Sequence, residues 1–191
     1  MIARALGALV ICFALAACVG IQAVKGGMPV NVGGDLTVDP QVDWATFGPA
    51  IADRVWTIDG FGLNELRFLT GIEPGSPLMQ ISGVGRENVA VYQQSMLPND
   101  VMDLVASTLG RIGHQQVRTS GLRPVPFGSA TGFRFDLDFV DKDGLEMKGM
   151  AMAAQRNGAL DMILFLAPAE YYFEHHAPTV ERVFASVRAA G

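Results

Sequence analysis

Two cysteines and three histidines are the residues of this chain best suited to nucleophilic or metal chemistry. Both cysteines, Cys12 and Cys18, lie in an apolar N-terminal segment, and no cysteine follows residue 18. This pattern excludes a disulfide scaffold, a thiolate cluster and a cysteine nucleophile from the domain that follows. His175 and His176 are adjacent, and neighbouring helix positions diverge by about 100°, so the two rings do not converge on one tetrahedral metal ion. We therefore expect no metal and no cofactor, and a solvated histidine pair at a helix entrance.

The other motifs that could carry chemistry are incomplete. Asp136 and Asp138 lie on one face of a predicted strand, about 7 Å apart, which leaves a weak cation site open beside the simpler interpretation of an Asp-rich hairpin. The stretch GVGREN (83–88) lacks the third glycine of a dinucleotide fingerprint. The stretch GSATG (128–132) lacks the first glycine of a nucleophile elbow. No catalytic residue is predicted, and an envelope hydrolase is only the third hypothesis.

The N-terminal segment has the features of an export signal. Arg4 is followed by an uncharged apolar run and then by Leu15-Ala16-Ala17-Cys18. This stretch resembles the lipobox of bacterial lipoproteins, in which a leucine and two small residues precede the modified cysteine. The resemblance implies cleavage between Ala17 and Cys18, a diacylglyceryl group on the Cys18 sulfur and an acylated new N-terminus. Several acyl chains hold a protein on a bilayer far more firmly than one.

An uncleaved signal anchor is the alternative, because uncharged residues continue from Ala5 to Val24, about the length of a membrane-spanning helix. Gly20, Gln22 and the small residues before Cys18 favour the lipoprotein. Residue 19 is Val and not Asp, which, by resemblance to enterobacterial sorting, favours the outer membrane, facing the periplasm, over the inner membrane.

Composition limits the rest of the chain to one domain without nucleic-acid binding. The chain has 191 residues, 50% of them hydrophobic, and a formal net charge of −5. An acidic chain lacks the clustered Lys and Arg that displace counterions from nucleic acid. We predict a signal peptide over residues 1–17, a lipidated N-terminus and flexible tether over 18–34, rich in glycine, and a single domain over 35–191.

The pattern along the domain predicts strands, a helix, more strands and a final helix. A hairpin is expected from 54–58 and 65–70, and an apolar face repeating every three to four residues predicts a helix over 98–113. Alternating or wholly apolar runs then predict a three-strand meander over 132–141, 145–155 and 159–168. A helix from about 177, with Pro178 in its first turn, closes the chain. The fold class is α+β, an antiparallel sheet packed by a middle and a C-terminal helix.

This order of elements resembles the PsbP/Mog-like fold. The resemblance covers roughly residues 98–188 and rests on PFG at 126–128, the run from Gly132 to Phe135, the Ala-Pro pair at 167–168 and a final helix ending VFASVR. The family includes the PsbP proteins of photosynthetic membranes and several bacterial envelope lipoproteins. The resemblance implies the fold and a non-enzymatic, binding role, and it transfers no site residues.

Two binding functions follow from these observations. The first is a lipid-anchored envelope protein that binds a protein partner or supports envelope assembly. The second is a carrier of an apolar small molecule or lipid, in a groove lined by Met and Phe, with Met150 and Met152 on one strand face and Trp44 and Trp56 at its mouth. The membrane, reached through the lipid, is the other expected partner.

Overall fold

A computed structural model describes residues 21–47, 54–80 and 89–189. Its centre is an eight-stranded sheet, antiparallel at every pairing, with the order β1-β4-β5-β6-β10-β9-β8-β7. The strands of this sheet are β1 (Ile21–Val24), β4 (Trp44–Phe47), β5 (Arg54–Thr57), β6 (Glu65–Ile72), β7 (Gln115–Phe127), β8 (Ala130–Val140), β9 (Glu146–Arg156) and β10 (Ala159–Pro168). A small hairpin of β2 (Val30–Gly33) and β3 (Leu36–Val38) forms a second sheet.

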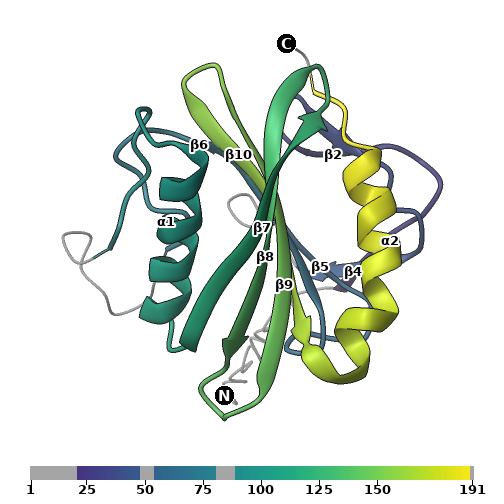
Figure 1. Ribbon diagram of the computed structural model, residues 1–191. Helices are drawn as coiled ribbons and strands as arrows, with labels where there is room; N and C mark the ends of the chain where they lie inside the picture. Colours follow the sequence, from purple (N-terminus) through teal and green to yellow (C-terminus); the bar gives the residue numbers. More distant parts are fainter. Residues whose placement is uncertain (1–20, 48–53, 81–88, 190–191) are drawn as a thin grey trace, which may run out of the picture.

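The two helices cover opposite faces of the large sheet (Figure 1). Helix α1 (Pro98–Arg111) packs on the face that carries the odd-numbered apolar residues of β8, from Phe133 to Phe139. Helix α2 (Glu174–Ala185) and the β2–β3 hairpin pack on the other face, against Met150 and Met152 of β9. The fold class is therefore the predicted α+β arrangement of a large antiparallel sheet with a middle and a C-terminal helix.

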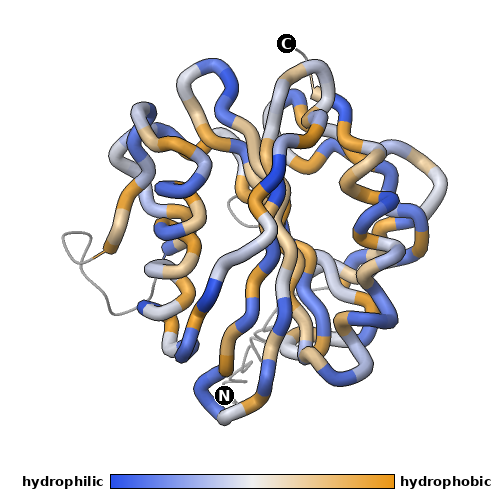
Figure 2. The backbone as a smooth tube through the Cα atoms, viewed as in Figure 1, coloured by the Kyte–Doolittle hydropathy of each residue, from blue (hydrophilic) through white to orange (hydrophobic). Residues whose placement is uncertain are grey.

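The central strands are apolar on both sides because both faces of the sheet are covered. β10 is buried from Leu160 to Pro168, with Ile163 and Phe165 toward α2 and Met162 and Leu164 toward α1. Figure 2 shows hydrophobic residues along these strands and hydrophilic residues at the β8–β9 and β9–β10 turns. The predicted meander is confirmed, as is the hairpin of β5 and β6.

Helix α1 begins where the sequence predicts, at Pro98. Leu97 is the N-cap residue, and its backbone N–H donates to the Asp100 carboxylate at 2.7 Å. A carboxylate in the first turn accepts from a free N–H group, and its negative charge interacts favourably with the positive end of the helix dipole. The second helix starts earlier than predicted, at Glu174. A short segment, η2 (Ala169–Phe173), leads into it, and its backbone leaves helical geometry at Glu170 and Tyr171. Pro178 therefore lies inside the helix, just past its first turn.

The expected tether is wrong from residue 21 onward. β1 pairs with β4 over four residues, and β2 and β3 form a hairpin within the stretch assigned to the tether and the domain start. The folded domain therefore includes residues 21–34, ahead of the predicted start at residue 35. Glycine-rich sequence hides these short strands, of which β1 pairs with the later strand β4, while β2 and β3 pair with each other.

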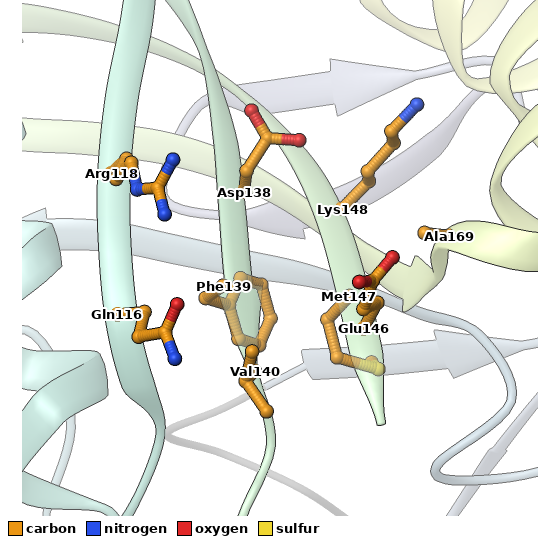
Figure 3. Close-up of a pocket in the computed structure, with 9 residues that line it drawn as sticks. All are labelled: Gln116, Arg118, Asp138, Phe139, Val140, Glu146, Met147, Lys148 and Ala169. Atoms are coloured by element: carbon orange, nitrogen blue, oxygen red, sulfur yellow. The ribbon is translucent and has the colours of Figure 1, made fainter. Parts of the chain in front are cut away.

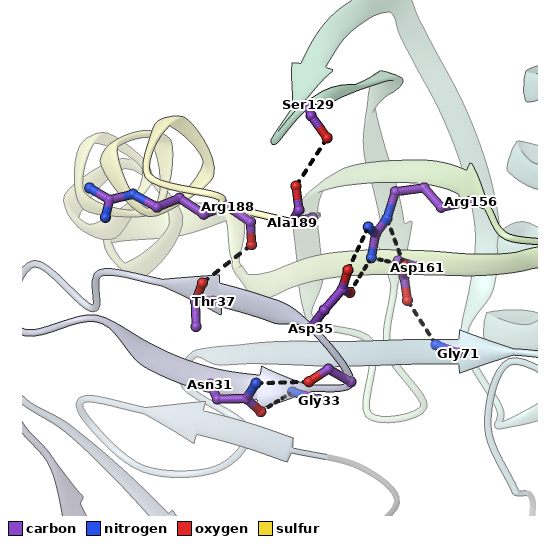
Figure 4. A network of polar contacts seen from close by, with 11 residues as sticks. Asn31, Gly33, Asp35, Thr37, Gly71, Ser129, Arg156, Asp161, Arg188 and Ala189 are labelled. Atoms are coloured by element: carbon purple, nitrogen blue, oxygen red, sulfur yellow. Dashed lines mark hydrogen bonds and ion pairs between the residues drawn. The ribbon is translucent and has the colours of Figure 1, made fainter. Parts of the chain in front are cut away.

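Polar contacts attach the β2–β3 hairpin to the rest of the domain (Figure 4). Arg156, at the end of β9, donates to Asp35 at 2.7 Å and to the buried Asp161 at 2.8 Å, and the Gly71 N–H donates to Asp161 at 2.8 Å. Thr37 and Arg188 exchange two backbone hydrogen bonds of 2.9 Å. The hairpin and the segment after α2 are therefore fixed to the same end of the large sheet.

Candidate functional site

Two open cavities lie on the α2 face of the sheet, over β7, β8 and β9. We call this part of the surface the α2-side trough. A charged row lines one of its cavities, and the other is an apolar groove. Along β8, Arg134, Asp136 and Asp138 alternate with the buried phenylalanine and leucine residues of the opposite face, so all three point into this trough. The sheet therefore presents a polar ladder beside the helix.

The charged row is Arg118, Asp138 and Lys148, which are cross-strand neighbours on β7, β8 and β9. They line an open cavity of about 260 Å³, and their side chains rise from three adjacent strands in Figure 3. Within the described residues Arg118 and Asp138 form no ion pair, and the Lys148 ammonium lies 5.9 Å from the centroid of the Phe173 ring. The row therefore presents positive, negative and positive groups whose hydrogen-bonding capacity is available to a ligand.

The apolar groove lies at the other end of the trough, between α2 and the paired ends of β7 and β8. Its volume is about 390 Å³. The side chains that line it are largely apolar, and the set used below is Val125, Pro126, Met152, Phe184 and Val187. Arg134 also lines the groove. Its guanidinium forms two hydrogen bonds to Glu181 of α2 and lies 5.5 Å from the centroid of the Phe184 ring.

Basic neighbours surround the two aspartates that the sequence offered for a weak cation site. Asp136 accepts from Arg123 at 3.3 Å and lies 4.0 Å from Arg134. Asp138 sits between Arg118 and Lys148 in the register. In the described part of the chain, no three His, Asp, Glu or Cys side chains form a group that could hold a metal ion.

The four predicted groove residues separate in the structure. Met152 lines the apolar groove, and the Met150 sulfur lies 3.6 Å from an Arg134 nitrogen. Trp44 and Trp56 do not lie at a groove mouth. Both are buried core residues whose ring centroids are 6.2 Å apart, and Trp56 packs on Phe68. The sequence can indicate that a tryptophan is buried, but only the tertiary packing shows whether its ring lies in the core or lines a cavity.

The expectation of a solvated histidine pair is wrong for His176. His175 stacks on Tyr171, whereas His176 is buried and its Nε2 lies 2.5 Å from the Asp59 carboxylate. Asp59 also accepts from Asn64 at 2.6 Å. Asn64 in turn accepts from Thr57, so the network leads into the β5–β6 turn.

His114 has a different environment, against the first strand residues of β7. Its ring packs edge-on against Phe139 at 4.7 Å, and its Nδ1 is buried without a partner among the described residues. Burial lowers the pKa of His114, and the negative charge of Asp141 opposes that shift in part. This histidine is part of the packing of the α1 side.

The sequence does not predict the two basic side chains of the charged row, Arg118 and Lys148. β7 lacks a regular alternation, so Arg118 falls outside the predicted strands. Residue pattern alone does not give the register that puts Lys148 beside Asp138. The signal that was present is the alternation of Arg134, Asp136 and Asp138 in β8. The predicted lipid attachment and cleavage residues, Cys18 and Ala17, lie outside the described residues. No helix of the described residues is long and apolar enough to span a membrane.

Comparisons with known proteins find distant likenesses among solved structures alone. No family model matches the chain, and no curated protein matches it. Among solved structures, the cyanobacterial PsbP protein (CyanoP) of Synechocystis sp. PCC 6803 is similar at 12% identity and a TM-score of 0.43, over 96% of this chain and 100% of that one. LpqN of Mycobacterium tuberculosis, described as involved in cell envelope biogenesis, is similar at 12% identity and a TM-score of 0.38, over 90% and 92%. A PsbP protein is thus among the solved structures to which this chain is similar.

Proposed function

We propose that this chain is a lipid-anchored protein of the bacterial cell envelope whose domain binds a protein partner through the α2-side trough, without catalysis. The observation that carries the binding proposal is the charged row, in which three cross-strand neighbours lack ion-pair partners in the described structure and face an open cavity. Exposed charges arranged in a fixed order select partners of complementary charge. A partner segment with acidic groups opposite Arg118 and Lys148 fits this row.

The lipobox supports the lipid anchor, and the position of β1 adds to that support. An uncleaved anchor over residues 5–24 needs about 20 consecutive residues to cross the hydrocarbon core. β1 takes residues 21–24 of that run into the sheet, where they pair with β4. The remainder, residues 5–20, counts sixteen residues, which is short for a span.

Lipidation is tested by metabolic labelling with an alkyne fatty acid. The wild-type chain should be labelled and Cys18→Ser should not. Equal labelling of both chains, or a membrane-bound protein that still begins at Met1, would refute the anchor. We expect outer-membrane fractionation of the labelled protein because residue 19 is not Asp.

Partner binding is tested by site-specific photo-crosslinking in cells that produce the chain. A photoreactive residue at Gln116, which lines the row, should give one discrete cross-linked species, and one at Ser107 on α1 should not. Lys148→Glu should abolish that species, because it reverses one charge of the row. Lys142→Glu makes the same charge change in the exposed β8–β9 turn and is the matched control. A cross-link that survives Lys148→Glu would refute the proposed surface.

The apolar groove favours the second candidate function, transport or storage of an apolar ligand. Its largely apolar lining and its volume of about 390 Å³ suit part of an acyl chain. Native mass spectrometry of the protein isolated from its own membrane should then show a bound apolar adduct. Val125→Trp, which fills the groove from β7, should remove it.

A further inference from the structure

In sequence, only two residues separate the proposed lipidation site at Cys18 from the first described strand. β1 begins at Ile21, so Val19 and Gly20 alone separate it from Cys18. An extended chain advances at most about 3.6 Å per residue, so the Cα atoms of Cys18 and Ile21 lie within about 11 Å of each other. An anchored Cys18 therefore holds β1 close to the lipid headgroups.

β1 is the edge strand of the large sheet, and exposed apolar side chains follow this edge. Ile21 is 66% exposed and Met28, in the turn after β1, is 64% exposed. Val42, also exposed, belongs to the neighbouring segment before β4. We call these three residues the β1-edge strip.

Backbone contacts fix the turn that carries Met28 against the segment that carries Val42. A Cβ placed on Gly26 would lie 2.8 Å from the Val42 backbone, so the two segments touch. Lys25 binds Asp43 at 2.5 Å, and the Gly27 N–H donates to Asp39 at 3.2 Å. The strip is thus part of the folded edge.

The charges along this edge indicate apolar and not electrostatic attraction. The one lysine, Lys25, is paired with Asp43, and its hydrogen bond lowers the pKa of that carboxyl. Asp39 adds negative charge nearby. Anionic lipid therefore has no net positive patch to bind here, whereas exposed Ile and Met side chains gain free energy on leaving water for the acyl boundary.

We propose that lipidation lays the β1-edge strip against the bilayer, so that the domain is seated on the membrane surface by its β1 edge instead of moving on a tether. The partner is a lipid surface, and zwitterionic lipid is sufficient. This inference rests on the lipid anchor of the proposed function.

The experiment measures contact with lipid at the two edges of the sheet. The full-length lipidated protein is purified and reconstituted in phosphatidylcholine vesicles that contain a spin-labelled phosphatidylcholine. A fluorophore is attached at Met28→Cys or, as the control, at Leu122→Cys, which is 38% exposed on β7 at the opposite edge. Seven strand spacings put these edges about 34 Å apart. The label at residue 28 should lose most of its fluorescence, and the label at residue 122 should keep it.

A linker variant separates seating from anchoring. A Gly/Ser linker of about 12 residues between Gly20 and Ile21 adds a root-mean-square span of about 19 Å. It should leave the lipid in place and restore much of the fluorescence at residue 28. Mass spectrometry of the N-terminal peptide reports the lipid independently.

The outcomes are distinguishable. A peptide without lipid refutes both the anchor and the seating. A lipidated protein in which the labels at residues 28 and 122 are quenched equally, or in which the linker changes nothing, refutes the seating and leaves the anchor standing.

Discussion

Arg156→Met should be among the most destabilising single substitutions in this domain. The Arg156 side chain is 7% exposed, and hydrogen bonds to Asp35 raise its pKa against the effect of burial, so the guanidinium stays charged. Methionine keeps much of the apolar stem but leaves the buried Asp161 carboxylate with the Gly71 N–H and no cation. Removing one partner of a buried pair costs about 3–5 kcal/mol. In a domain of this size that lowers the thermal midpoint by about 6–20 °C.

Two matched variants test the reason for this loss. Asp35→Asn removes the other carboxylate of the same guanidinium, but Asp35 is 43% exposed, so the cost should be about 1 kcal/mol or less. The double variant Arg156→Met/Asp161→Asn removes the stranded charge and keeps an acceptor for Gly71. It should be about 1–2 kcal/mol more stable than Arg156→Met alone.

The assay is thermal and urea unfolding of the unlipidated domain from Val19 onward, followed by circular dichroism. Equal urea slopes among the variants show that the midpoints report stability. The reasoning is wrong if Arg156→Met costs no more than Asp35→Asn. It is also wrong if the double variant is less stable than the single one, because the loss would then come from packing and not from an unpaired charge.

Two further predictions concern burial and strand spacing. Because burial lowers the pKa of His114, the unfolded chain binds the proton first as the pH falls below about 6.5, and acid weakens folding. His114→Leu should therefore flatten the decrease of the urea midpoint between about pH 7 and pH 5.5, and an unchanged slope would contradict this. A Cβ on Gly132 would lie 2.6 Å from the carbonyl oxygen of Ala153, so Gly132→Ala should cost about 1–3 kcal/mol in urea unfolding. Gly110→Ala, in open space on α1, should stabilise by about 0.5–1 kcal/mol, and similar effects at both glycines would refute the steric argument.

The local residue pattern predicts the strands that alternate regularly or that are apolar on both faces. β8 alternates apolar and charged residues from Phe133 to Phe139, and β10 is almost wholly apolar because it is central and covered on both faces. β7 was missed for a physical reason. As an edge strand it contains Pro124, Pro126 and a positive φ at Gly121, with two bulges in its pairing to β8. These features break the alternation and also protect a free edge from pairing with another chain.

The parts of the site that depend on distant pairs could not be predicted from the sequence. His176 is buried and its ring meets Asp59, which is 117 residues away in the sequence. The charged row exists because bulges in β7 bring Arg118 opposite Asp138. A pattern of residues predicts that Asp138 faces outward, but only the register shows which charges lie beside it.

The two proposals constrain each other through the order of strands. Seating by β1 puts one edge of the sheet at the lipid, and the charged row lies on β7, β8 and β9 at the other edge, up to about 34 Å away. A partner therefore binds the charged row outside the headgroup layer. Such a partner is either soluble or projects from the membrane. With the linker of about 12 residues, the domain would keep the row but lose its fixed height and orientation. Crosslinking at Gln116 to a membrane-anchored partner should then weaken, whereas crosslinking to a soluble partner should not change. The linker variant thus reports which kind of partner the row binds.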